Sequence, residues 1–378
     1  MAATYQFGIE EELFLADART RGTPRRVKRF HEDIHERIPE VERELLVSQV
    51  EIMTPPCTDF AAARASLWDL RKRLAEVGRA HGILVLGGGT HPAAKWQRQS
   101  QTKKERYDAI ADDMQMLARR DVVCGMHVHV EIPQPARRVN LMNRLLPYTP
   151  TLLALSASSP FWQRQETGLS AYRLSVWGEM PRTGLPELFA DNEDYDRFVA
   201  AMVQSGAIAD ASFLWWTLRP SIHFPTLELR VADSCTRLED TLTIAALYRC
   251  LVRRLDFNPE LNRGLTSVSR AIVSENMWRA QRRGIHASFI DEGGNVTPFA
   301  DNLEAILDDI AEDADILGCS QEIARARTIV SRGTSADCQL AVFAKARASG
   351  GSKAEALAAV IDWMAETTVN GEEVGSVP

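Results

Sequence analysis

Residues 124–132 read Cys-Gly-Met-His-Val-His-Val-Glu-Ile, and this alternation predicts a β-strand. Successive side chains of a strand point to opposite faces, so His127, His129 and Glu131 would share one face opposite an apolar one. Burying such polar groups costs free energy unless they are paired or bound to a metal ion. The row therefore favours a functional strand, and the alternative is a solvated face that holds two histidines.

Carboxylates occupy the polar faces of two further predicted strands. In residues 5–15, Glu10 and Glu12 share a face, and in residues 45–53 Glu51 projects between two apolar neighbours. Two carboxylates on one strand face repel each other unless a cation lies between them. These strands therefore predict a cation site.

The last predicted strand, residues 224–231, places Glu228 and Arg230 on one face. Either the two form a structural ion pair, or the glutamate binds a cation while the arginine holds an anionic oxygen. Glu44 lies seven residues before Glu51, an odd offset that puts it on the opposite face of a regular strand. It joins the others only through a bulge or a turn, and otherwise it is a surface carboxylate.

Together these polar faces offer a set of ligands that is rich in oxygen and poor in sulfur and nitrogen. Such a set suits Mg²⁺ or Mn²⁺ better than zinc. Carboxylates, one histidine and a nearby arginine indicate phosphoryl transfer, in which cations neutralise nucleotide phosphates. The residues are Glu10, Glu12, Glu51, His127 and Glu228, with Arg230 beside them.

The bulk composition is that of an ordinary globular protein, with 45% hydrophobic and 25% charged residues. A net charge of -7 gives no electrostatic footprint for nucleic acid. No apolar run approaches the ~20 residues that span a bilayer, and the N-terminus lacks a signal-peptide pattern, so we expect no membrane association and a cytoplasmic location. The six cysteines lie far apart in the sequence, and we expect them to be reduced and mostly buried.

The 378 residues fit two domains or one large unit. We expect one catalytic domain over residues 1–367, with a helical C-terminal portion at about 267–367 and a disordered tail at 368–378. A triple glycine at 87–89 lacks the flanking residues of a nucleotide-binding loop and is interpreted as a turn. Helices are predicted from Thr58 or Asp59 to Gly82, at 107–120 and at 238–255.

Four of these segments occur in the order seen in the carboxylate–amine ligase family, also called glutamate–cysteine ligase type 2, which belongs to the glutamine synthetase-like superfamily. They are Gly-Ile-Glu-Glu-Glu-Leu at 8–13, Val-Glu-Ile-Met-Thr-Pro-Pro at 50–56, Gly-Met-His-Val-His at 125–129 and Thr-Leu-Glu-Leu-Arg-Val-Ala-Asp at 226–233. The resemblance runs from about residue 5 to 285 and includes Trp177–Pro186, Arg219–Ser221 and Glu275–Ala280. The chain thus resembles this family over most of its length.

The resemblance implies an α+β fold, with a curved, mostly antiparallel sheet and helices packed on its outer face. The concave face would hold ATP, two or three Mg²⁺ ions and a glutamate-like substrate, and the protein would form a homodimer. The implied metal ligands are Glu10, Glu12, Glu44, Glu51, His127 and Glu228. Arg230 would hold the γ-phosphate and act with Glu228 in catalysis, His129 and Arg219 would bind the nucleotide, and Arg173 and Arg182 would bind the substrate. For Arg173, Arg182 and Arg219 the alternative is a surface ion pair.

The hypothesis is therefore an ATP-dependent ligation through an acyl phosphate, joining L-glutamate and L-cysteine into γ-glutamylcysteine with release of ADP and phosphate. The partners would be small-molecule carboxylate and amine substrates, and the base that deprotonates the amine is not identifiable from the sequence. One alternative is a metal-dependent hydrolase that uses His127 and His129, although such a site needs further histidines at set spacings. The other is a non-catalytic sensor that binds a nucleotide or metabolite.

Overall fold

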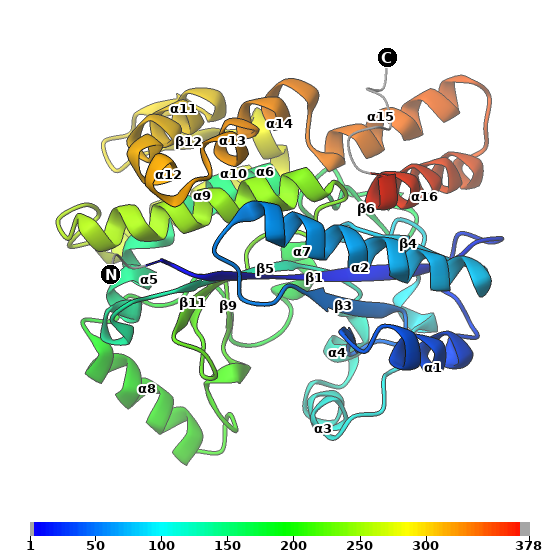
Figure 1. Cartoon of the computed structure of the whole chain (residues 1–378), viewed down its shortest axis with the longest axis horizontal. Coiled ribbons are helices and arrows are strands. Elements are labelled where there is room, and N and C mark those ends of the chain that lie inside the picture. The colour runs from blue at the N-terminus through cyan, green and yellow to red at the C-terminus, as the bar shows by residue number, and fades with distance from the viewer. Residues whose placement is uncertain (1–3, 371–378) are drawn as a thin grey trace.

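The computed structural model describes residues 4–370, and its centre is a seven-stranded sheet with the order β10-β11-β5-β1-β3-β2, in which β4 also pairs with β1 (Figure 1). Every pairing in this sheet is antiparallel. The mostly antiparallel sheet that the family resemblance implied is therefore confirmed. Its strands are β1 (Phe7–Asp17), β2 (Val41–Arg43), β3 (Gln49–Met53), β4 (Ile83–Leu86), β5 (Met126–Glu131), β10 (Leu218–Pro220) and β11 (Thr226–Leu229).

Two long helices cover the apolar face of this sheet, α2 (Phe60–Ala80) and α9 (Leu238–Phe257), as Figure 1 shows. The Asp59 side chain accepts a hydrogen bond from Ala62 N and so begins α2. The apolar side chains of α2 recur at helical spacing and are all buried, as predicted: Leu67, Leu70, Leu74 and Val77. The helix α9 is buried almost all round, which is typical of a central helix in a large core.

A buried ion pair joins the sheet to this helical layer. Glu11 lies on the apolar face of β1 with no exposure, and Arg71 of α2 donates two hydrogen bonds to it, at 2.9 and 2.7 Å. Thr241 of α9 also donates to Glu11, at 2.6 Å. Because each group is paired, the charges are tolerated in the core, and the pair ties three elements together.

Helices also form the layer beyond α9, which includes the C-terminal part of the chain (Figure 1). The helical pattern predicted beyond Ser267 is interrupted by a short hairpin of β12 (Ser288–Ile290) and β13 (Val296–Pro298). The helices of this part are α10 (Ser267–Arg283), α11 (Phe299–Asp309), α12 (Ala311–Leu317), α13 (Ser320–Ala324), α14 (Ala326–Arg332), α15 (Ser335–Ala348) and α16 (Lys353–Asn370).

The disordered tail predicted from Thr368 is wrong for residues 368–370, because α16 continues to Asn370. The Thr368 hydroxyl accepts a hydrogen bond from Gly87 N at 2.9 Å, and its carbonyl accepts one from Arg71 at 3.2 Å. These contacts with the core hold the end of the helix in place. Residues 371–378 lie outside the described part of the chain.

The remaining elements connect these layers. The single helix predicted at 107–120 is two helices, because Gln115 has a positive φ of 51° that breaks the helical path. The connecting helices are α1 (Lys28–Arg37), α3 (Glu105–Met114), α4 (Met116–Arg120), α5 (Arg138–Leu145), α6 (Thr149–Ser156), α7 (Arg173–Trp177) and α8 (Asn192–Gln204). The short strands are β6 (Phe161–Trp162), β7 (Gln165–Glu166), β8 (Thr183–Gly184) and β9 (Trp215–Trp216).

The cysteines and the hydropathy of the helices can be compared with the expectations from composition. The six cysteines are free and buried, as predicted. Among residues 4–370, no helix combines the length and the apolar character needed to cross a bilayer.

Candidate active site

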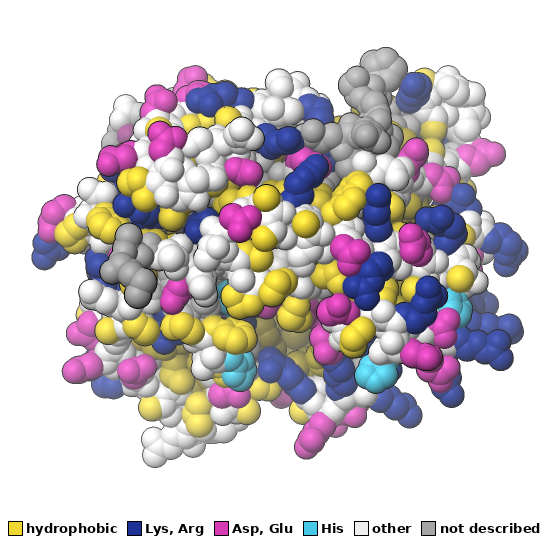
Figure 2. Space-filling model, in the orientation of Figure 1, with side chains coloured by type: hydrophobic (Ala, Val, Ile, Leu, Met, Phe, Trp, Pro, Cys, Tyr) yellow, Lys and Arg dark blue, Asp and Glu magenta, His cyan; other side chains and the backbone are white. Residues whose placement is uncertain are grey.

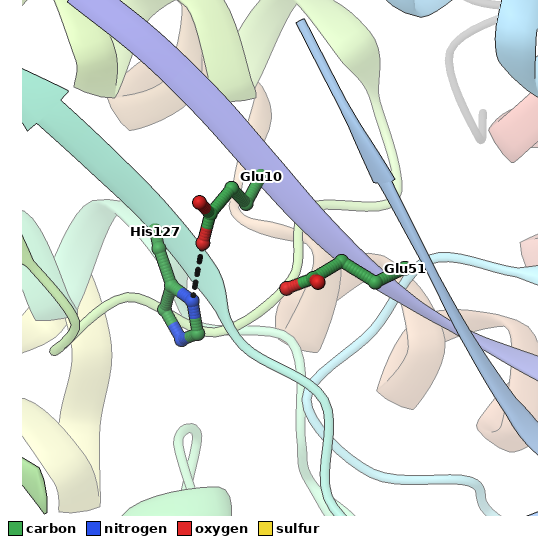
Figure 3. Close-up of side chains that lie close together, drawn as sticks. All are labelled: Glu10, Glu51 and His127. Atoms are coloured by element: carbon green, nitrogen blue, oxygen red, sulfur yellow. Dashed lines mark hydrogen bonds and ion pairs between the residues drawn. The ribbon is translucent and has the colours of Figure 1, made fainter. Parts of the chain in front are cut away.

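The register of the sheet brings the predicted acidic and histidine side chains together. Glu10 of β1 lies opposite His127 of β5, and Glu12 lies opposite Glu51 of β3. His129 of β5 lies opposite Glu228 of β11 in the same way. Residues two apart on a strand share a face, so these side chains project from the face opposite the buried core, as Figure 3 shows for three of them.

Among the described residues, three overlapping groups have ligand atoms within 4.8 Å of one another. Each group contains one histidine at most, which distinguishes the site from zinc sites built on several histidines. The groups are Glu10 with Glu51 and His127, Glu10 with His129 and Glu228, and Glu12 with Glu44 and Glu51.

Glu44 joins this site through a turn, the route that its odd spacing required. It follows β2 directly, and its backbone N–H donates to Gln49 O at 3.5 Å across the turn into β3. Its carboxylate accepts hydrogen bonds from Leu45 N at 3.1 Å and from the Tyr107 hydroxyl at 3.5 Å. The surface-carboxylate alternative is therefore wrong for Glu44.

The carboxylates of this site repel one another. Burial, and then the charges of Glu44, Glu10 and Glu12, raise the pKa of Glu51 far above its usual value. Burial and the charge of Glu12 raise the pKa of Glu44 to about 7. A cation that binds between these groups would remove the repulsion that keeps them protonated.

Two histidines have the opposite effect on Glu10. Although burial opposes ionisation, hydrogen bonds from His127 and His129 hold the pKa of Glu10 well below its usual range. His127 uses Nδ1 for this contact, at 3.3 Å, and its buried Nε2 has no hydrogen-bond partner. An imidazole nitrogen that makes no hydrogen bond and lies 3.9 Å from Glu12 Oε1, beside mutually repelling carboxylates, fits a divalent cation with mainly oxygen ligands.

Glu228 lies between two arginines at the other side of the site. Arg219 donates to Oε2 from Nε at 3.0 Å and from Nη2 at 2.7 Å, while Arg230 pairs with Oε1. Although burial opposes it, the charges of Arg230 and Arg219 lower the pKa of Glu228 to about 2. The structural ion pair between Glu228 and Arg230, considered above as an alternative, is thus present. Glu228 nevertheless also lies next to His129 and Glu10, in one of the three groups that could hold a cation.

The other two predicted arginines differ in their positions. Arg173 lies in the wall of the cavity, with its guanidinium 5.5 Å from the Trp177 ring and its Nε buried without a partner. Arg182 does not line the cavity, because it packs over Trp215 and donates to Phe213 O at 3.2 Å. The structure therefore leaves Arg182 without direct access to a ligand in this cavity.

The carboxylates, histidines and arginines described above for this site, apart from Arg182, line a cavity of about 440 Å³. A second cavity of about 900 Å³ adjoins it and shares Glu10, His129 and Phe224 with the first. In Figure 2, hydrophobic side chains gather along the middle of the face and around a recess below it. The predicted cation ligands thus line the first cavity, and Glu10 also lines the second.

The cavity also has polar residues that the strand pattern did not predict. Lys104, Arg106 and Tyr107 reach it from the start of α3, and Asp121 follows α4. None of them belongs to a strand, so no period-two alternation marks them. The amphipathic pattern of α3 predicts a helix but does not predict what its first turn faces.

Comparison with known proteins finds relatives over nearly the whole chain. The model of the glutamate–cysteine ligase family 2 matches residues 6–362. A Bradyrhizobium diazoefficiens protein named "Putative glutamate--cysteine ligase 2" is 44% identical over 379 residues, covering 99% of this chain and 87% of that protein. A Rhodospirillum rubrum protein of the same name is 44% identical over 375 residues, covering 97% of this chain and 96% of the relative.

Solved structures share the fold at low sequence identity. A bifunctional glutathione synthetase from Pasteurella multocida superposes with a TM-score of 0.69 at 15% identity over 96% of this chain, which spans about half (52%) of that protein. A glutamate–cysteine ligase from Francisella tularensis, solved with AMP, gives a TM-score of 0.62 at 11% identity, covering 97% of this chain and 89% of that one. These likenesses confirm the α+β fold. From its family match over residues 6–362 and its relatives at 44% identity, the chain belongs to the glutamate–cysteine ligase family 2, a family of ATP-dependent ligases.

Proposed function

We propose that the protein joins the γ-carboxylate of L-glutamate to the amine of L-cysteine, with ATP converted to ADP and phosphate. The observation that carries the proposal is the position of three overlapping cation-ligand groups on the wall of the first cavity, where Glu10 and His129 also line the second. A nucleotide and an acid that enter from the two cavities would meet at these ligands. The names of the relatives and the AMP bound to the Francisella enzyme support this choice of substrates.

Magnesium, or manganese in its place, would be held by the three groups. Glu51 contributes to two of them, as does Glu10, so neighbouring ions would share these carboxylates. A bound divalent ion supplies positive charge that neutralises phosphate oxygens. The clustered carboxylates and the His127 Nε2, which makes no hydrogen bond, fit this role.

The chain's own cations would act on the transferring phosphoryl group. Arg230 has a buried Nε without a partner, and Glu228 fixes the orientation of its guanidinium. Arg219 is held by the same carboxylate and by the carbonyl oxygens of Ser212 and Leu214. Donors fixed in advance stabilise charge in the transition state without having to reorganise.

The reaction then follows in two steps. A carboxylate oxygen of glutamate attacks the γ-phosphorus of ATP, and the bond to ADP breaks, which gives an acyl phosphate. The amine nitrogen forms a bond to the acyl carbon, phosphate leaves with the electrons of the C–O bond, and a proton leaves the nitrogen. The arginines and the cation ligands serve the first step.

The experiment is an ADP-release assay with ATP, glutamate and cysteine in the presence and absence of Mg²⁺, with the product mass measured. We expect ADP and γ-glutamylcysteine to appear together, only with Mg²⁺, and to be lost in Glu51→Gln. ADP release without an amide product, or full activity in Glu51→Gln, would contradict the proposal. A panel of other acids and amines identifies the substrates if this pair is inactive.

We further propose a cytoplasmic homodimer, as the family resemblance implies. The oligomeric state is tested by light scattering coupled to size-exclusion chromatography. A mass near twice the 42.1 kDa of the chain is expected, and a mass near that of one chain contradicts the dimer.

A further inference from the structure

Asp121 is a carboxylate in the wall of the 440 Å³ cavity that has no cation of its own. Its Oδ1 is buried and accepts no hydrogen bond, and no ion pair holds either of its oxygens within residues 4–370. The adjacent Arg120 is unavailable, because its Nε and Nη2 each lie 2.6 Å from the carboxylate of Glu179. A ligand in the cavity is therefore the remaining source of a partner.

An unpartnered carboxylate in this position is costly. Burial, and then the charge of Glu12, raise the pKa of Asp121 to about 7, while the charges of Arg173 and Arg230 act in the opposite direction and Glu179 adds to the rise. A positively charged ligand group would remove this penalty, because it pairs with the ionised form. The cavity thus has an unmet requirement for a cation at this point.

The surroundings indicate which kind of cation this is. Asp121 belongs to none of the three groups that can hold a metal ion in the described part of the chain. The same cavity has arginines for anionic groups, namely Arg173, Arg219 and Arg230, and apolar side chains from Trp177 and Met180. A cation that comes with a substrate, and not with the metal cluster, fits this arrangement.

We propose that Asp121 binds the protonated amino group of the amine substrate and so selects a cationic amine for the second step. The bound ammonium group releases one proton to solvent before its nitrogen attacks the acyl carbon, and the second proton leaves as the amide forms. This inference rests on the proposed ligase function and specifies the residue that recognises its second substrate. One charge-assisted hydrogen bond to a buried carboxylate contributes about 1.5–3 kcal/mol, which corresponds to roughly a 10- to 100-fold change in binding.

The experiment compares two nucleophiles, cysteine and hydroxylamine, with ATP, Mg²⁺ and glutamate held constant. Cysteine presents an ammonium group at neutral pH, whereas hydroxylamine is uncharged there and reports acyl phosphate formation as a hydroxamate. In Asp121→Asn we expect the KM for cysteine to rise by about 10- to 100-fold while hydroxamate formation stays within about twofold of the wild type. Asp121→Glu keeps the charge and should restore part of the cysteine affinity.

Asp113→Asn is the matched control, because Asp113 is an exposed carboxylate on the neighbouring helix α3. It should leave both reactions unchanged. If Asp121→Asn lowers the unfolding midpoint, Asp121→Ser, whose side chain is smaller, makes the same comparison. Equal loss with both nucleophiles, or no loss with cysteine, would overturn the role of Asp121. Failure of the wild type to form hydroxamate from any acid would instead overturn the proposed ligase function.

Discussion

Glu10 and His127 face each other across β1 and β5, with Glu10 Oε2 3.3 Å from His127 Nδ1 (Figure 3). When Nδ1 carries the proton of this contact, Nε2 keeps its lone pair, and Nε2 has no other hydrogen-bond partner. A carboxylate that orients an imidazole in this way is a common feature of metal sites. The geometry of the pair therefore suits the presentation of one nitrogen to the proposed cation.

His127→Gln should weaken Mg²⁺ binding by roughly 10- to 100-fold, because it removes both this nitrogen and its orientation by Glu10. Isothermal titration with Mg²⁺ measures the effect. His286→Gln is the control, since His286 is exposed and pairs with Asp337 away from the cavity. Equal Mg²⁺ affinity in the two variants would exclude His127 as a ligand.

Glu51→Gln should stabilise the metal-free protein and at the same time remove its response to Mg²⁺. The neutral amide relieves the repulsion by Glu44, Glu10 and Glu12 that raises the pKa of Glu51. We expect the metal-free unfolding midpoint to rise by about a few degrees, as seen by calorimetry. Glu36→Gln on the exposed surface of α1 controls for the lost charge. A lower midpoint in Glu51→Gln would show that the carboxylates are not in conflict.

The stabilisation by Mg²⁺ should grow as the pH rises. The pKa of Glu44 is about 7 in the fold against a usual 4.5, so the folded metal-free protein keeps a proton that the unfolded chain has released between these values. The stability from Glu44 is therefore fully present below the unfolded pKa and is lost as the pH rises through the folded pKa. His129, whose pKa is raised by Glu10 and Glu228 against the effect of burial, contributes with the same sign.

Mg²⁺ competes with these protons for the carboxylates. It should therefore shift the unfolding midpoint little near about pH 5, where Glu44 of the folded protein is protonated, and much more near about pH 8, where Glu44 is ionised. Differential scanning fluorimetry at constant ionic strength measures this. Glu44→Gln should flatten the pH dependence of the metal-free midpoint. An Mg²⁺ shift that is equal at both pH values argues against titrating carboxylate ligands.

Arg71→Met should destabilise the fold by about 3–5 kcal/mol, because it leaves the buried charge of Glu11 without a partner. Urea unfolding measures the free energy. The matched control is Arg73→Met on the same helix, where the ion pairs with Asp69 and Glu40 are on the surface and contribute less than about 1 kcal/mol. The double variant Glu11→Leu with Arg71→Met should recover part of the loss, and no recovery would contradict the pairing.

Gly125→Ala should impair catalysis by displacing Arg173. A Cβ at residue 125 would lie 2.2 Å from Arg173 Nη2, so the guanidinium has to move from the cavity wall. Small displacements in an active site cost on the order of 100-fold in rate, and steady-state kinetics measures kcat/KM. Gly22→Ala, where the nearest atom is 3.7 Å from the added Cβ, is the control. Unchanged kcat/KM in Gly125→Ala would remove Arg173 from the proposed site.

The strand faces of the site could be predicted from the sequence because a period of two depends only on local geometry. Glu10, Glu12 and Glu51 follow this rule, and the structure places them on one face. Glu44 could not be assigned in this way, because it lies in a turn between two strands, where the alternation of side chains between the two faces does not apply. Glu11 breaks the apolar alternation, and its partner Arg71 could only be found by folding the chain.

Residues outside the strands were harder to place. Asp121 and Lys104 reach the cavity from segments whose direction is set by tertiary packing, and no spacing in the sequence encodes it. Arg182 has the expected charge but packs over Trp215 in place of entering the cavity. The hairpin β12–β13 lies inside an otherwise helical region. It was not predicted from the sequence, because two such short strands do not change the helical periodicity of the surrounding residues.

In the proposed reaction, divalent ions on the strand carboxylates promote phosphoryl transfer from ATP to a substrate carboxylate. The most direct measurement uses glutamate labelled with heavy oxygen in its γ-carboxylate, with ATP, Mg²⁺ and cysteine, and mass analysis of the released phosphate. Transfer through an acyl phosphate predicts that one labelled oxygen appears in each phosphate. Phosphate that carries no label, formed together with the amide, would contradict the account.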